Sequence, residues 1–138
     1  MNQLPESLKN LNFLVTDDYE SMRIMIATHL RELGVNNISF ANSGNNALAI
    51  IKSRLTAADP VQFLLTDLAM DDGDGIELVR QLRTVNELKK LPILMITSKS
   101  DVSLVIDAAK AGVNNYIVKP WQTEELMKKI IDTYNKTR

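Results

Sequence analysis

Short apolar runs alternate along this chain with longer segments in which apolar residues return every three or four positions. Short apolar runs fit buried strands, and the three-to-four spacing gives a helix one apolar face. The predicted strands are residues 11–16, 37–42, 61–66, 93–97 and 115–118. The predicted helices cover about residues 22–33, 45–57, 74–82, 101–111 and 126–134.

Local signals mark where several of these helices begin and end. Gly34 and Gly112 each follow the last apolar position of a helix, where glycine favours a stop. Asp74, with Glu77 three residues later, resembles a capping box that opens the third helix. The residues expected to face the core are Met22, Met25, Ile26, Leu30, Leu33, Leu48, Ile51, Leu55, Ile76, Val79, Leu82, Leu126, Met127, Ile130, Ile131 and Tyr134.

The order of the elements is strand then helix, repeated five times. Such repeats require parallel strands joined by right-handed crossovers, with helices on both faces of the sheet. We therefore predict an α/β fold, a doubly wound sheet of five parallel strands in the order 2-1-3-4-5. In this topology the switch point lies between the first and third strands, where a ligand site is expected.

The composition bounds what the chain can be. With 138 residues, 45% of them apolar, we expect one domain with a core over about residues 8–136, a monomer, and no output domain. A formal net charge of −1 offers no general attraction to nucleic acid or to a membrane. The N-terminal sequence MNQLPESLKN lacks the pattern of a signal peptide, so a cytoplasmic location is expected.

Two residue counts exclude further classes of site. The chain has no cysteine, which rules out disulfides, thiolate zinc sites and thiol chemistry. His29 is the only histidine, so a histidine-cluster metal site is also excluded. We expect His29 to be a packing residue among the apolar positions of the first helix.

Polar side chains end four of the predicted strands. Asp17 and Asp18 follow the first strand, Asp67 the third, Thr97 closes the fourth, and Lys119 follows the fifth. Because the carboxyl ends of parallel strands meet at one edge of the sheet, these side chains should lie together. Three carboxylates, a hydroxyl and an ammonium suit a magnesium-assisted phosphoryl site with a carboxylate acceptor.

Clustered carboxylates need compensation. Each close pair repels by roughly 1–4 kcal/mol for effective dielectric constants of 80 down to 20. An isolated Asp-Asp pair often only caps a loop, but Asp67 across the switch point makes a Mg²⁺ site the better interpretation. Lys119 precedes Pro120, and a cis peptide bond there could direct the ammonium back into the crevice.

These motifs together resemble response-regulator receiver domains, and more closely the single-domain chemotaxis regulators. The segments that carry the resemblance are FLVTDDYESMR at 13–23, LLTDLAM at 64–70, DGIELVRQLR at 74–83, LPILMIT at 91–97 and AGVNNYIVKPW at 111–121. The resemblance covers residues 8–136 and implies the flavodoxin-like (βα)5 receiver fold. It also implies a phosphorelay protein that accepts a phosphoryl group from a histidine kinase.

The resemblance assigns roles by position. It makes Asp67 the phosphoacceptor, with Thr97 and Lys119 bonding phosphoryl oxygens. Mg²⁺ would be held by Asp18, Asp67 and the backbone carbonyl of Ala69, and by Asp17 largely through water. The chain would then phosphorylate itself and slowly lose the phosphoryl group, acting as a switch and not as a turnover enzyme.

The resemblance also implies a protein-binding face on the fourth helix, fifth strand and fifth helix. Tyr116 would be its switch residue, turning inward when Thr97 moves toward the phosphoryl group. The remaining residues expected on this face are Val102, Val105, Val118, Trp121 and Lys129. A component of the flagellar motor switch is one expected target, without nucleic acid or membrane as partners.

The chain departs from the family pattern at several positions. Asp71 stands where proline is usual, and Ala69 and Lys99 occupy positions that tune the phosphoryl lifetime. The stretch 53–62 is some five residues longer than in compact chemotaxis regulators. These departures bear on partner and kinetics, and leave the receiver assignment in place.

Several alternatives stay open at this point. Within the receiver class, a phosphate sink or a non-motility relay competes with a motor ligand. A Mg²⁺-dependent aspartyl phosphatase is a different class, although Asp67-Leu68-Ala69 lacks the second acid of its usual Asp-x-Asp motif. A flavin binder of flavodoxin shape is a third, against which stands an acidic, glycine-free loop at residues 17–21.

Overall fold

The computed structural model describes residues 3–70 and 74–138. Its strands are β1 (Asn12–Thr16), β2 (Asn37–Ala41), β3 (Phe63–Asp67), β4 (Ile93–Thr97) and β5 (Asn115–Val118). Its helices are α1 (Glu6–Lys9), α2 (Glu20–Glu32), α3 (Gly44–Thr56), α4 (Gly75–Arg83), α5 (Val105–Ala111) and α6 (Thr123–Asn135), with 3-10 helices η1 (Asn86–Leu88) and η2 (Lys99–Leu104).

The five strands form one parallel sheet in the order β2-β1-β3-β4-β5, which confirms the predicted doubly wound fold. Thr16 of β1 pairs with Thr66 of β3, and Asp67 pairs with Ile96 of β4. Thr97 in turn pairs with Val118 of β5. The strands therefore end nearly level, and the residues that follow them share one edge.

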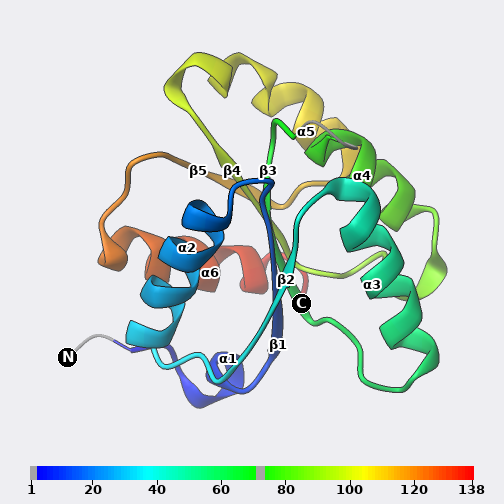
Figure 1. Ribbon diagram of the computed structural model, residues 1–138, viewed down its shortest axis with the longest axis horizontal. Helices are drawn as coiled ribbons and strands as arrows, with labels where there is room; N and C mark the ends of the chain where they lie inside the picture. Colours follow the sequence, from blue (N-terminus) through cyan, green and yellow to red (C-terminus); the bar gives the residue numbers. More distant parts are fainter. Residues whose placement is uncertain (1–2, 71–73) are drawn as a thin grey trace.

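Helices cover both faces of the sheet. In Figure 1, α2 and α6 lie on one side, and α3, α4 and α5 lie on the other. The central strands β3 and β4 are buried along their whole length. Their continuous apolar sequences follow from this position, since a strand covered on both faces has no solvent side to make polar. Phe13 and Phe63 stack at 4.8 Å between ring centroids within the α2 and α6 layer.

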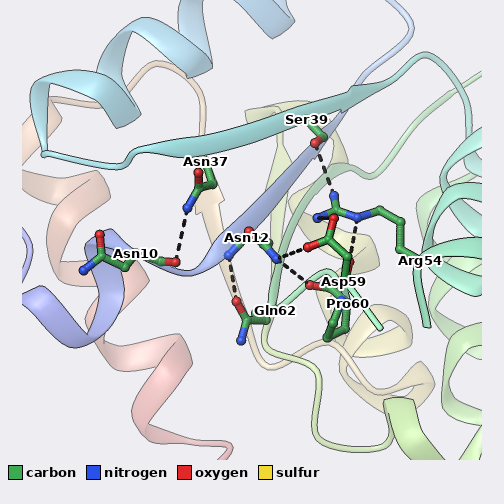
Figure 2. Close-up of polar contacts among 8 residues, drawn as sticks. All are labelled: Asn10, Asn12, Asn37, Ser39, Arg54, Asp59, Pro60 and Gln62. Atoms are coloured by element: carbon green, nitrogen blue, oxygen red, sulfur yellow. Dashed lines mark hydrogen bonds and ion pairs between the residues drawn. The ribbon is translucent and has the colours of Figure 1, made fainter. Parts of the chain in front are cut away.

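A network of polar side chains lies at the opposite, amino-terminal edge of the sheet (Figure 2). We call it the amino-edge cluster; its members are Asn10, Asn12, Asn37, Ser39, Arg54, Asp59, Pro60 and Gln62. Arg54 forms an ion pair with Asp59 at 3.3 Å and donates to its backbone oxygen and to Ser39. Asn12 donates to the Asp59 carboxylate and to the Pro60 carbonyl. These bonds hold the long 53–62 segment against the starts of the strands.

The sequence signals at the helix ends are present in the structure. Gly34 and Gly112 adopt φ values of +96° and +118°, which glycine adopts without the clash that a Cβ would cause. The Asp74 side chain accepts a hydrogen bond from the Glu77 N–H at 2.8 Å, one half of the predicted capping box. None of the helices in residues 3–70 and 74–138 combines the length and apolar character that crossing a bilayer requires.

Two short helices were not predicted. Helix α1 has four residues after Pro5, too few to give a periodic pattern, yet Leu4 and Leu8 are fully packed into the core. The packed chain therefore begins before residue 8. Helix η1 spans three residues and buries only Leu88.

Two other predictions about helices are wrong. The fourth predicted helix was expected to be α-helical from about residue 101, but η2 is a 3-10 helix and α5 begins at Val105. None of the residues of η2 is buried, so no packing holds that turn at α-helical spacing. Met25 was expected in the core but is 37% exposed, because Ile26, Ala27 and Leu30 form the buried face of α2.

Candidate functional site

Three carboxylates meet at the carboxyl edge of the sheet, as predicted. Asp17 and Asp18 lie directly after β1, and Asp67 is the last residue of β3. One carboxylate oxygen from each residue lies within 4.8 Å of the other two. We call these three residues the acidic cluster. Since β1 and β3 are neighbours in the sheet, the cluster sits at the switch point of the fold.

The acidic cluster contains buried polar atoms without partners. Among the residues that the structure describes, Thr16 Oγ1, Asp17 Oδ2 and Asp18 Oδ1 are buried and lack a hydrogen bond. The other oxygen of Asp17 accepts the Tyr19 N–H at 2.9 Å, which fixes the carboxylate in place. Buried oxygens are normally satisfied, so these three atoms are free to bind a group from outside the chain. Oxygen atoms of this kind fit a hard divalent cation such as Mg²⁺.

Burial also shifts the acidity of the cluster. It raises the pKa of Asp67 to about 6, against the opposing effect of Lys119, while the nearby Asp17 adds to the increase. Burial likewise raises the pKa of Asp17, which the Tyr19 N–H partly offsets. The ionised cluster is thus under-compensated by the protein, and a bound cation would supply the missing charge.

Lys119 is the cationic member of the site. Its Nζ lies 3.7 Å from Oδ2 of Asp67, and its backbone N–H donates to the Thr97 carbonyl at 2.8 Å. The Lys119-Pro120 peptide bond is cis. The predicted convergence of Lys119 and the Asp67 carboxylate is therefore present.

Thr97 ends β4, the strand beside β3, and is 1% exposed. Its neighbour Ile96 pairs with Asp67, so Thr97 lies one residue beyond Asp67 along the shared edge. Among the residues described, the hydroxyl donates to the Ser98 carbonyl alone, at 3.3 Å. A bond of that length is weak, which leaves the hydroxyl able to bond a stronger acceptor.

Gly75 belongs to the site although its role was not predicted. A Cβ at this position would overlap the backbone carbonyl of Asp67, and the Gly75 N–H donates to the Leu68 carbonyl at 2.9 Å. Only glycine lets the start of α4 approach the end of β3 so closely. A glycine directly after the capping Asp74, at a helix start, was the available signal.

A groove opens beside the acidic cluster. It encloses about 530 Å³ and is lined by Asp18, Tyr19, Leu68, Ala69, Met70, Asp74, Ile76 and Leu104. Ala69, whose carbonyl was expected to be a metal ligand, therefore borders the same space as Asp18. Asp71, the predicted departure from the family pattern, lies outside the described residues.

A second cavity separates Thr97 from Tyr116. It has a volume of about 210 Å³ and an apolar lining that includes Leu68, Met95 and Val105. Tyr116 borders this cavity while Lys129 Nζ lies 5.0 Å from the centre of its ring. Thr97 and Tyr116 therefore border one shared, mainly apolar space.

The predicted partner-face residues differ in exposure. Val102 is 42% exposed on η2, whereas Val105, Val118 and Lys129 are half-buried. Trp121 is only 8% exposed, and its indole N–H donates to Nδ1 of His29 at 3.1 Å. Trp121, which was expected on the partner-binding face, therefore exposes little of its side chain. The sequence could not indicate this, because its partner lies 92 residues away.

Comparison with known proteins identifies relatives over nearly the whole chain. Residues 13–131 match the response regulator receiver domain family. The chain is 40% identical over 122 residues to chemotaxis protein CheY-3 of Vibrio cholerae, covering 88% of this chain and 90% of that protein. It is 39% identical over 120 residues to chemotaxis protein CheY of Pseudomonas aeruginosa, covering 87% and 93%.

Solved structures agree with the fold. A protein described as a response regulator from Chloroflexus aurantiacus superposes with a TM-score of 0.82 at 31% identity, covering 92% of this chain and 99% of that one. The Vibrio cholerae chemotaxis protein CheY4 superposes with a TM-score of 0.77 at 27% identity, covering 90% and 98%.

Proposed function

This chain belongs to the response regulator receiver domain family, and we propose that it is a phosphorylation switch whose acceptor is Asp67. The observation that carries the proposal is the set of unpaired buried oxygens beside Asp67 and Lys119. A carboxylate held next to a lysine ammonium, among oxygen atoms that fit a divalent cation, is arranged to receive a phosphoryl group.

The proposed step is one phosphoryl transfer. A carboxylate oxygen of Asp67 attacks the phosphorus of a phosphohistidine on a histidine kinase. The new O–P bond forms as the P–N bond breaks, and the departing imidazole takes up a proton from water. The product is an acyl phosphate on Asp67, and later hydrolysis by water returns the carboxylate and inorganic phosphate.

The side chains around Asp67 act by position and charge. Lys119 would pair with a phosphoryl oxygen, and Thr97 would donate its hydroxyl to another. Asp17, Asp18, Asp67 and the Ala69 carbonyl would hold Mg²⁺, which when bound neutralises charge on the phosphoryl oxygens. None of these groups needs to turn over a substrate, so the chain acts as a switch and not as an enzyme.

The switch would reach Tyr116 through Thr97. A phosphoryl oxygen offers the Thr97 hydroxyl a charge-assisted hydrogen bond, stronger than its 3.3 Å bond to Ser98. Thr97 and Tyr116 border the same cavity, so an inward shift of Thr97 changes the space available to the ring. Phosphorylation would then favour an inward ring that is already accessible.

The relatives suggest where the switch is used. The curated relatives at about 40% identity are chemotaxis proteins, so we propose a role in chemotaxis with a protein target on the α5–β5–α6 face. A flagellar motor component is the first candidate target, and a phosphate sink or another relay is the alternative. Val102 and the half-buried Val105 and Lys129 would contribute to that face.

Labelling with a small phosphodonor tests the acceptor. The chain with acetyl phosphate and Mg²⁺ should gain one base-labile phosphoryl group, detected by intact-protein mass spectrometry. Asp67→Asn should abolish the label, while Asp59→Asn, at the amino edge, should keep it as the matched control. Label that survives in Asp67→Asn would contradict the proposal. Continuous release of phosphate from added phosphomonoesters would favour an aspartyl phosphatase instead.

A separate variant tests the switch. Thr97→Ala should still take the phosphoryl group on Asp67, but its response at residues 100–130 to the mimic beryllofluoride should be largely lost. Amide chemical shifts with and without beryllofluoride measure this response. Shifts in the unmodified protein that stay next to Asp67 would indicate a phosphate store rather than a switch.

A further inference from the structure

The hydrogen bond between Trp121 and His29 joins two parts of the chain that are distant in sequence. The indole N–H donates to Nδ1 of His29 at 3.1 Å, and the two rings meet edge to face at 6.1 Å between centroids and 80° between planes. Trp121 packs in the same apolar cluster as Ile26 and Leu30 of α2. An apolar side chain could fill the same position in this cluster. The hydrogen bond from the indole N–H is therefore a directional contact beyond what packing requires.

The bond connects the two halves of the candidate site. His29 lies on α2, the helix that follows Asp17 and Asp18, while Trp121 lies two residues after Lys119. The strands that carry these halves, β1 and β5, are separated in the sheet by β3 and β4. The ring pair therefore bridges parts that the sheet does not join directly. It lies on the face of the sheet that α2 and α6 cover, and Figure 1 shows these two helices on one side.

The turn that carries Lys119 is held at both ends. At the first end the Lys119 N–H donates to the Thr97 carbonyl at 2.8 Å, and at the other end the buried Trp121 donates to His29. Pro120 between them is exposed. A lysine side chain is long and flexible, so the direction of its ammonium depends on how firmly the turn beneath it is fixed.

We propose that His29 is a positioning residue for phosphoryl transfer: through its hydrogen bond to Trp121 it holds the turn that presents Lys119 to Asp67. The proposal rests on the proposed function of Asp67. It requires a neutral imidazole with its proton on Nε2, because only an unprotonated Nδ1 can accept the indole N–H. His29 does not touch the reacting groups and acts through Trp121.

The chain offers a closely matched pair of variants. His29→Asn places a carbonyl oxygen as many bonds from the backbone as Nδ1, and His29→Leu has the same branched shape without an acceptor. Leucine has a higher helix propensity than asparagine, so helix stability alone would favour His29→Leu. The variant that is expected to recover function is His29→Asn. Any advantage of His29→Asn is therefore assigned to the hydrogen bond.

Three readouts separate positioning from general stability. The indole N–H resonance of Trp121, the sole tryptophan, should move in His29→Leu and stay near its native position in His29→Asn. Phosphorylation by acetyl phosphate with Mg²⁺ should slow about three- to tenfold in His29→Leu, the effect of one neutral hydrogen bond, and recover in His29→Asn. Mg²⁺ affinity should stay the same or increase, because a displaced ammonium repels the cation less.

Each outcome decides the proposal. Equal phosphorylation rates in the two variants, or a joint loss of rate and Mg²⁺ affinity, would overturn it. In a Trp121→Phe background, which lacks the donor, the two variants should become equal in rate, and a remaining difference would also overturn it. If His29→Leu does not fold, Trp121→Phe alone must show the slower rate with retained Mg²⁺ affinity. Failure of the unsubstituted protein to accept a phosphoryl group would instead refute the role of Asp67.

Discussion

The two edges of the sheet each gather polar side chains but treat them differently. At the amino edge Arg54 pairs with Asp59 at 3.3 Å, and Asn12 donates to both Asp59 and Pro60 (Figure 2). At the carboxyl edge Asp17 and Asp18 each keep a buried oxygen without a partner among the described residues. At the amino edge the polar side chains pair with other groups of the chain. At the carboxyl edge some buried oxygens have no such partner among the described residues.

The same residue type therefore has two roles in this fold. The Asp59 side chain is 67% exposed and paired with an arginine, whereas the Asp67 side chain is 10% exposed and faces a lysine only at 3.7 Å. Polar groups left buried without partners lower stability, so a fold keeps them where a ligand will complete them. This difference in burial and pairing distinguishes the amino-edge cluster, a structural network, from the acidic cluster, the candidate functional one, without reference to relatives.

The largest expected difference between the edges is in metal binding. Asp18→Asn should weaken Mg²⁺ binding by roughly a hundredfold, because it removes a full charge next to a divalent cation. Asp59→Asn should leave the affinity unchanged. Isothermal titration calorimetry measures both. Equal affinities in the two variants would remove the distinction between the edges.

The second prediction concerns the stability of the metal-free protein. Asp67→Asn should raise the free energy of unfolding by about 3 kcal/mol at neutral pH, since burial of the carboxylate disfavours its ionised form. The folded-state pKa of Asp67 is about 6 and its ordinary value is 3.8. The folded state thus binds more protons between these values, and stability falls as the pH rises through this range.

The pH dependence of this stability gain tests whether the ionised carboxylate of Asp67 causes it. The gain from Asp67→Asn should be fully present above about pH 6 and shrink as the pH falls toward 4, where the carboxyl is protonated in both states. Urea denaturation at several pH values measures it. Saturating Mg²⁺ should cancel the gain, because the cation stabilises only the form that has the carboxylate. A destabilising effect at neutral pH without metal would contradict the account.

The smallest effect is expected at the amino edge. Asn12→Ala removes donors to Asp59 and to the Pro60 carbonyl, and should lower the free energy of unfolding by about 1 kcal/mol. Asn37→Ala, which removes a single exposed bond of 3.3 Å to Asn10, serves as the milder control. Neither variant should change Mg²⁺ affinity or phosphorylation. A loss of phosphorylation in Asn12→Ala would mean that the edges are coupled.

The local pattern of apolar and polar residues was sufficient to predict most of the fold and the acidic cluster. The bounds of β4 and β5 agree with the prediction, because each apolar run is flanked by polar residues or proline. The acidic cluster was predictable since parallel strands end at a common edge. Topology alone brings Asp17 and Asp67 together.

Contacts between distant segments could not be predicted. The bond from Asn12 to Asp59 spans 47 residues, and the bond from Trp121 to His29 spans 92. No periodic pattern encodes which donor meets which acceptor across such distances. The 3-10 start before α5 also escaped prediction, because it depends on missing packing around residues 99–104 and not on their helix propensity.

We propose that the carboxyl edge keeps these buried oxygens for a cation and a phosphoryl group. Amide chemical shifts during a Mg²⁺ titration of the unsubstituted protein test it most directly. We predict saturable shifts at Asp17, Asp18 and Asp67, and no shifts at Asn12 or Asp59. Shifts centred on the amino edge, or no saturable shift at the acidic cluster, would contradict it.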